Sequence, residues 1–240
     1  MIALMRAEFQ KLHGSLALLV AVAAPALPGF LAMLALLTND EPASWSDSFR
    51  FALPLWCLFL APMVIAAFTA LAAQIEHRGR GWDHLLTLPI PGWQIYAAKT
   101  AVIFVAASMM SVLVIGFTVL GTLIGGEFGS ALPQEPFPWR NLAWQTLLIF
   151  ASTAALVALQ SWIALRFANF VIPLVLGISG TLVAMAVMMT RTQQADWFPW
   201  VLPYKALIEP EPVPYAVAGA VGGLFIIIIM IVDLSKREVR

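Results

Sequence analysis

Residues 96–125, YAAKTAVIFVAASMMSVLVIGFTVLGTLIG, decide the class of fold, because Lys99 is the only charged side chain in thirty consecutive positions. A helix needs about 20 apolar residues to cross a hydrocarbon core of about 30 Å. The stretch therefore predicts a membrane-spanning helix. Lys99 lies near one end of it, from which its long side chain can extend to the membrane surface.

Five further stretches have the same apolar character. Together with the first they predict six spans, at residues 15–37, 49–73, 96–125, 142–165, 170–189 and 213–232. The whole chain is 61% hydrophobic and only 11% charged, whereas soluble proteins are about 45–50% apolar and about 25% charged. Strict alternation of polar and apolar residues, which is typical of membrane barrels, is absent. We therefore expect an all-α, polytopic membrane protein with a single domain over residues 1–240.

The distribution of positive charge predicts the orientation. Placing the N-terminus inside leaves nine of the thirteen Lys and Arg residues on the inner side, as the positive-inside rule requires. Both termini are then cytoplasmic. In residues 1–13, Met5, Phe9 and Leu12 recur at helical spacing among charged neighbours, which predicts an amphipathic helix along the inner surface. The alternative is a disordered charged tail that only sets the orientation.

The segments between the spans differ in character. The predicted outer segment 190–214 is rich in proline and aromatic residues, which favours a stiff, irregular loop with an interfacial aromatic belt. The predicted inner segment around 76–92 combines charges with a leucine run and a Pro-Gly turn, which indicates a short amphipathic helix in a loop. That loop carries more side chains than a simple link needs, so we interpret it as a docking site for a separate subunit.

Missing motifs limit the possible chemistry. The chain has no GxxxxGK[ST] phosphate loop, no HExxH zinc helix and no GxSxG nucleophile elbow, so we predict no catalytic residue and no metal or cofactor site in it. The predicted spans are nearly free of ionisable groups, which disfavours a proton- or sodium-coupled transporter. Their neutral polar residues are candidates for a substrate pathway, or alternatively for hydrogen bonds between helices. The candidates are Ser108, Ser111, Gln145 and Gln160.

Two glycine pairs lie within the predicted spans, Gly121 with Gly125 and Gly219 with Gly223. Small residues at this spacing allow two helices to approach closely. The pairs are compatible with a permease that works as two membrane subunits.

Particular residues carry a family resemblance. They are Glu8-Phe9-Gln10-Lys11-Leu12 near the start, Glu76, the turn Leu88-Pro89-Ile90-Pro91, and Lys99. In these residues and in its six predicted spans, the chain resembles the membrane subunit of a type-2 ABC exporter. It is most similar to permeases of the lantibiotic-immunity and bacitracin-resistance type, which confer antibiotic resistance. The likeness covers most of the chain in topology and about the first hundred residues in sequence.

The resemblance implies that residues 76–92 form a coupling helix that docks into a groove of a cytoplasmic ATPase subunit. Polar contacts would come from Glu76, Arg78, Arg80 and Asp83, and apolar ones from Leu85, Leu86 and Leu88. The partner would bind ATP and magnesium, and a second permease, identical or homologous, would complete the transporter in the lipid of a bacterial inner membrane. The exported substrate would be amphipathic or hydrophobic, such as a peptide antibiotic or a lipid-like molecule.

Two alternatives differ in class. A membrane scaffold or immunity protein would sequester its ligand without ATP and without a partner ATPase. A lipid-modifying membrane enzyme would need a reactive cluster at the inner surface, and His77, Asp83 and His84 are the only candidates for it.

Overall fold

The apolar stretches form long helices in the computed structural model, which describes residues 2–38, 42–78, 89–129, 131–190 and 194–237. The elements, in chain order, are α1 (Ile2–Leu12), α2 (Leu16–Leu37), α3 (Trp45–Leu55), the π-helical turn η1 (Trp56–Leu60), α4 (Ala61–Arg78), α6 (Gly92–Phe128), α7 (Trp139–Arg166), α8 (Val171–Thr190), α9 (Leu202–Ile208) and α10 (Val213–Arg237). No strand occurs within these described ranges.

Six helical stretches are long and apolar enough to cross a membrane. They are α2, the continuous stretch α3–η1–α4, α6, α7, α8 and α10. The predicted all-α polytopic fold is therefore confirmed. The 37 residues of α6 span about 55 Å at 1.5 Å per residue, so this helix extends well beyond a hydrocarbon core of about 30 Å.

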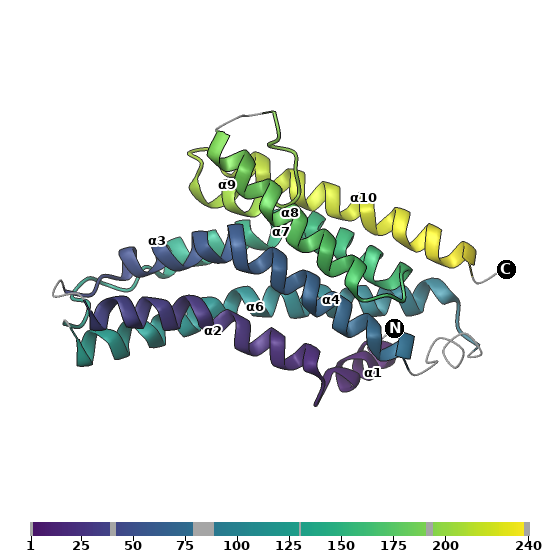
Figure 1. Ribbon diagram of the computed structural model, residues 1–240, viewed down its shortest axis with the longest axis horizontal. Helices are drawn as coiled ribbons and strands as arrows, with labels where there is room; N and C mark the ends of the chain where they lie inside the picture. The colour runs from purple at the N-terminus through teal and green to yellow at the C-terminus, as the bar shows by residue number, and fades with distance from the viewer. Residues whose placement is uncertain (1, 39–41, 79–88, 130, 191–193, 238–240) are drawn as a thin grey trace.

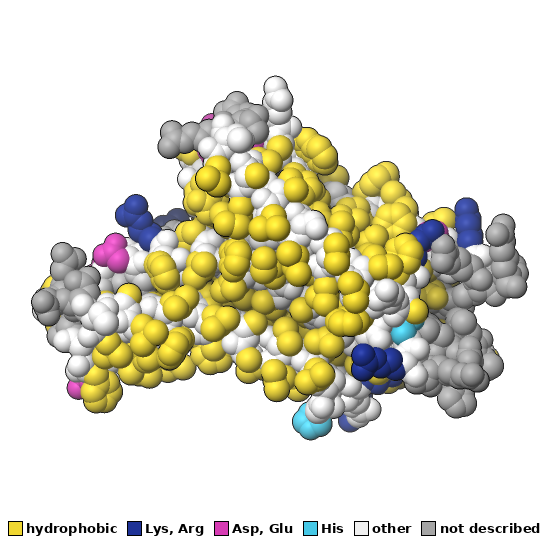
Figure 2. Space-filling view, viewed as in Figure 1, with side chains coloured by type: hydrophobic (Ala, Val, Ile, Leu, Met, Phe, Trp, Pro, Cys, Tyr) yellow, Lys and Arg dark blue, Asp and Glu magenta, His cyan; other side chains and the backbone are white. Residues whose placement is uncertain are grey.

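The helices run roughly along the long axis of the molecule, and both termini lie at the same end (Figure 1). We call this end, which carries α1 and the last turn of α10, the termini end. The opposite end, where α2 finishes and α3 begins, is the loop end. Figure 2 shows hydrophobic side chains over the middle of the visible face and charged side chains toward both ends. This distribution is expected of a protein whose middle lies in lipid.

Glycines bring two pairs of helices into close contact within this chain. A Cβ atom on Gly121 of α6 would lie 2.0 Å from the carbonyl oxygen of Gly29 in α2. A Cβ atom on Gly219 of α10 would lie 2.3 Å from the carbonyl oxygen of Ser152 in α7. Small residues at these crossings let backbone approach backbone. The two glycine pairs are therefore used inside the chain.

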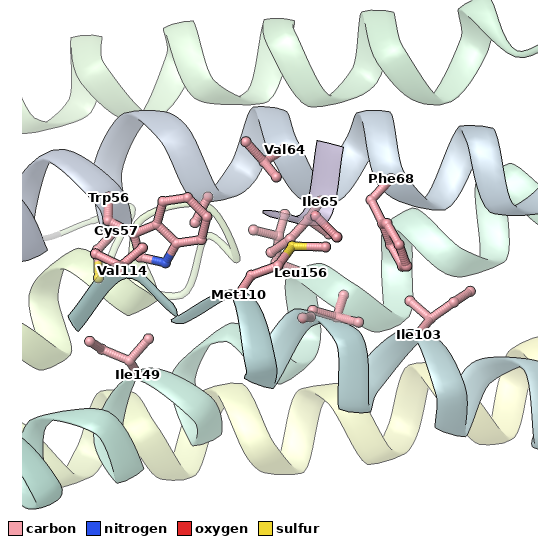
Figure 3. Packing of buried hydrophobic residues seen from close by; sticks show 14 of the residues in the cluster. Trp56, Cys57, Val64, Ile65, Phe68, Ile103, Met110, Val114, Ile149 and Leu156 are labelled. Carbon is pink, nitrogen blue, oxygen red and sulfur yellow. The ribbon is translucent and has the colours of Figure 1, made fainter. Parts of the chain in front are cut away.

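The central core lies where the second span bends. The π-helical turn Trp56–Leu60 follows Pro54 and precedes Pro62, and proline removes a backbone donor that a regular helix would use. Trp56 is 1% exposed, and its indole Nε1 donates to Ser111 Oγ of α6 at 3.3 Å. Figure 3 shows the surrounding side chains, among them Met110 and Leu156, filling the space between the helices.

The segment after α8 differs from the predicted irregular outer loop. Trp200 is 2% exposed, and its Nε1 donates to the carbonyl oxygen of Gly177 at 3.2 Å. Gly177 lies thirteen residues before the end of α8 at Thr190, which is about 20 Å along the helix axis. The described segment between α8 and α9 therefore folds back into the helix bundle before α9 begins. Its apolar residues fill a space beside α8, and the indole occupies the room left by Gly180.

Candidate functional site

The first helix is turned back across the bundle at the termini end. It finishes at Leu12, and Gly14 follows with a φ of +72°, a left-handed conformation that glycine adopts without strain. Ser15 then caps α2, its Oγ accepting from the backbone NH of Leu18 at 3.3 Å. The turn places the Glu8 and Leu12 side of α1 against the bundle, where both side chains are buried.

Four charged side chains from three helices form a closed ring at this end. Lys11 Nζ of α1 lies 2.5 Å from Glu8 Oε1 and 3.0 Å from Glu76 Oε1 of α4. Lys99 Nζ of α6 lies 2.6 Å from Glu8 Oε2 and 2.7 Å from Glu76 Oε2. Each carboxylate bridges both ammonium groups, so the four charges cancel. We call these four residues the charge ring.

The charge ring is mostly out of contact with solvent. The side chains of Glu76 and Lys99 are 2% and 4% exposed, and Glu8 is 7% exposed, whereas Lys11 is 30% exposed at the rim. A buried charge is tolerated when it is paired and hydrogen-bonded. Removing one partner from a buried pair leaves an uncompensated charge and costs about 3–5 kcal/mol. The ring therefore depends on all three helices staying together.

The two ring members of α1 show how the charges affect one another. Burial raises the pKa of the Glu8 carboxyl, but the ammonium groups of Lys99 and Lys11 outweigh burial and hold this pKa below its usual range. Burial lowers the pKa of the Lys11 ammonium, but hydrogen bonding and attraction to Glu8 and Glu76 outweigh burial and raise this pKa. Both groups are therefore charged at neutral pH.

The charge ring borders the segment that the sequence predicts to be the coupling loop. Glu76 lies in the last turn of α4, and Lys99 lies in the second turn of α6, which begins at Gly92. The ring thus ties together the helix that enters this segment, the helix that leaves it, and α1. Within the described ranges, these ion pairs therefore transmit a movement of any one of the three helix ends directly to the other two.

The predicted partner-contact residues are only partly described. Arg78 is exposed and its Nε donates to Gln74 Oε1 at 3.1 Å. Glu76, expected to touch a partner, instead directs both carboxylate oxygens at Lys11 and Lys99. The others, Arg80, Asp83, Leu85, Leu86 and Leu88, lie outside the described residues.

The ring itself was missed at the level of sequence, although all four of its residues carry the family resemblance. From the sequence alone, Lys99 is expected to reach the membrane surface and Glu76 to contact a partner. A signal was present: two acidic and two basic residues on three segments, all at the expected depth of the inner surface. Recognising it required knowing that α1 folds back onto α4 and α6.

The four predicted pathway residues are not gathered in one place. Ser111 accepts from Trp56 and donates to the carbonyl oxygen of Ala107 at 3.4 Å. Gln160 is fully buried, and in the orientation that satisfies its amide, its nitrogen donates to the Pro173 oxygen at 3.2 Å and its oxygen accepts from the Gly177 nitrogen at 3.3 Å. The structure thus places these two residues in contacts that join helices.

The other two pathway candidates lie elsewhere. Ser108 is half-buried on α6. Gln145 lines a cavity at the loop end.

Candidates for enzymatic chemistry are not assembled in the described part of the chain. Nε2 of His77 lies 3.2 Å from the carbonyl oxygen of Ala164, while Asp83 and His84 lie outside the described residues. Among the residues the structure places, no group of three His, Cys, Asp or Glu side chains could hold a metal ion.

A second ion pair at the termini end joins α7 to α10 through Arg166 and Asp233, and Trp162 Nε1 also donates to Asp233 at 3.0 Å.

Comparison with known families finds a match over most of the chain. The family model described as "ABC-2 family transporter protein" matches residues 4–184. The matched part contains the whole charge ring and reaches into α8. No curated protein and no solved structure matches the chain.

Proposed function

Since the chain belongs to the ABC-2 transporter family and has six apolar helices long enough to span a membrane, we propose that it is the permease subunit of an ATP-driven exporter. ATP and magnesium are bound by a separate cytoplasmic subunit, and a second permease, identical or homologous, completes the complex. The termini end faces the cytoplasm of a bacterial cell, and the protein lies in the inner membrane. The substrate is an amphipathic or hydrophobic molecule.

The single observation that carries this proposal, beyond the family match, is the position of the charge ring. It links α1, α4 and α6 where α4 enters and α6 leaves the predicted coupling segment. A permease driven by a partner needs such a link, because force applied to a loop must reach the helices that line the pathway. An ATP-independent scaffold has no comparable need for it.

Each part of the coupling region has a proposed role. Arg78, Arg80 and Asp83 make polar contacts with the ATPase, and the three leucines, Leu85, Leu86 and Leu88, fill an apolar groove on it. Glu76 acts as a positioning residue, because its carboxylate is held inside the ring rather than offered to a partner.

The proposed movement follows from these contacts. When two ATPase subunits close on ATP, the coupling segments of two permeases move, and the ring carries that displacement to α1. The turn at Gly14 passes it on to α2. The helices then rock as packed bodies between two states. ATP can drive this change only by binding one of the two states more tightly than the other.

Co-purification tests the docking step. The tagged chain is extracted under mild conditions in three forms, namely wild type, Leu85→Asp, and Arg140→Gln as a control at the loop end. Loss of a central apolar anchor costs about 2 kcal/mol or more of binding free energy. We expect wild type and the control to retain a protein that hydrolyses ATP, and the Leu85→Asp form to lose it.

Two outcomes would contradict the proposal. One is an intact wild-type chain that purifies without any ATP-hydrolysing protein, which would favour the scaffold. The other is an ATPase that remains bound equally well to the Leu85→Asp form, which would place the docking site elsewhere.

A further inference from the structure

A cavity of about 480 Å³ opens at the loop end between α3, the start of α7 and the end of α9. This volume lies within the range of about 300–1,000 Å³ that is typical of small-molecule sites. Its apolar wall includes Phe49, Leu53 and Leu207, and its polar side chains include Arg50, Asn141 and Gln145. The cavity is remote from the charge ring, which lies at the other end of the molecule.

Three polar side chains of this cavity have no partner within the part of the chain that is described. The exposed Arg50 makes no ion pair or hydrogen bond there, and neither do the side chains of Asn141 and Gln145. Asn141 and Gln145 are four residues apart on α7, so they lie on one face of the helix. A guanidinium and two amides thus line one space as hydrogen-bond donors that have no partner among the described residues.

The lining of the cavity favours an anion. No Asp or Glu is among its lining residues. The Glu135 carboxylate accepts from the backbone NH of Ser46 and from Ser44 Oγ, both at 3.0 Å. Glu209 lies 3.5 Å from Lys205, which also pairs with Asp196 at 2.6 Å, and Asp47 lines a different recess. Arg50 is therefore the one charged side chain that the described lining offers to a ligand.

The depth of Arg50 favours an amphiphile. The α3–η1–α4 stretch has 34 residues, or about 51 Å, which exceeds the hydrocarbon core by about 10 Å at each end. Arg50 lies five residues into it from Trp45, which is about 8 Å from the loop end. This is the level of lipid head groups, with the apolar wall of the cavity beside it.

We propose that this cavity binds the anionic head group of an amphiphile, with Arg50 holding a phosphate or carboxylate and with the apolar wall receiving the start of the hydrocarbon chain. Arginine suits this task, because its planar guanidinium can donate two parallel hydrogen bonds to such a group. Asn141 and Gln145 donate to the remaining oxygens. The site does not depend on the export proposal, because binding requires no ATPase.

Native mass spectrometry of the purified chain in a neutral maltoside detergent tests this site, with dodecyl phosphate as the probe. Wild type is compared with Arg50→Gln, Gln145→Ala, Arg50→Lys and the control Arg140→Gln, which changes a cation at the same end that does not line this cavity. Inorganic phosphate and dodecyltrimethylammonium separate the contributions of charge and chain. Gel filtration checks that every variant remains folded.

We expect wild type and Arg140→Gln to bind one dodecyl phosphate per chain with the same affinity. Binding should fall at least tenfold in Arg50→Gln, and should fall less in Gln145→Ala and in Arg50→Lys, which keeps the positive charge but loses the two parallel hydrogen bonds. Equal binding by Arg50→Gln and wild type would overturn the proposal, as would equal affinity for the ammonium amphiphile. Full displacement of the probe by an equal concentration of inorganic phosphate would also overturn it, because the apolar wall would then contribute nothing.

Discussion

The two ends of the molecule use charge in opposite ways. At the termini end, two carboxylates and two ammonium groups from α1, α4 and α6 close a ring with separations of 2.5–3.0 Å. At the loop end, Arg50 lines a cavity and pairs with no described residue. The paired charges hold helices together, whereas the unpaired charge remains available to a ligand. Whether a charged side chain has a partner within the chain, more than its burial or its residue type, decides which of these two roles it has.

The largest effect is expected when the charge ring is opened. Lys99→Met leaves the buried carboxylates of Glu8 and Glu76 facing each other with only Lys11 between them. Breaking a buried pair in this way costs about 3–5 kcal/mol, so the unfolding temperature in detergent should fall sharply. Lys236→Ala removes an exposed cation from the same end and should change stability by less than about 0.5 kcal/mol. Equal unfolding temperatures for both variants would contradict the structural role of the ring.

A smaller effect is expected when the close contact between α2 and α6 is disturbed. Gly121→Ala would place a Cβ atom 2.0 Å from the backbone of Gly29, and such overpacking costs about 1–3 kcal/mol. Gly116→Ala in the same helix meets nothing within 4 Å and should stabilise α6 by about 0.5–1 kcal/mol. Thermal unfolding of the two variants should therefore shift in opposite directions. A shift in the same direction would show that α2 and α6 do not pack as described.

A partly exposed ion pair is expected to contribute less to stability than the buried charge ring. Arg166 and Asp233 join α7 to α10 at the termini end, with about a quarter of each side chain exposed, at 28% and 27%. Pairs that remain in contact with solvent contribute about 1 kcal/mol or less. Arg166→Gln should therefore destabilise the protein far less than Lys99→Met in the same unfolding assay. Equal losses would mean that burial does not explain the strength of the charge ring.

The smallest effect is expected at Arg50. Because its guanidinium has no described partner, Arg50→Gln should change the free energy of unfolding by no more than about 0.5 kcal/mol. The measurement is thermal unfolding without added amphiphile. A loss of 2 kcal/mol or more would assign Arg50 to the structure and remove the contrast between the two ends.

The sequence predicts the spans well because lipid leaves few choices. A run such as 96–125 must be helical to satisfy its own backbone, and the structure extends it only to Gly92 and Phe128. The segment from Asp196 to Ile208 was harder to predict. Its prolines and aromatic residues indicate a loop, and only the room beside Gly177 and Gly180 explains why Trp200 is buried.

The candidate site was less accessible to sequence reasoning, because its contacts are distant along the chain. Glu8 and Glu76 are both bound by Lys99, yet nothing local to either carboxylate indicates that partner. Gln160 and Gln145 look alike as polar residues in the same helix. One is buried against α8 and the other faces a cavity, a distinction that depends on which helices pack beside them.

A distance measurement tests directly whether the charge ring carries movement from the proposed ATPase partner to the far end of the molecule. Spin labels are attached at two exposed positions, Leu37→Cys at the loop end and Met189→Cys at the end of α8, while the native Cys57 is buried. The distance between the labels is measured with the ATPase bound, before and after ATP is added. The same measurement is made with Glu76→Gln and Lys99→Gln introduced together, a change that leaves the Glu8–Lys11 pair.

We expect ATP to shift the label distance when the charge ring is intact. We expect no shift in the double variant, even though the ATPase remains bound. The same shift in both proteins, or no shift in either, would contradict the claim that the ring couples the two ends.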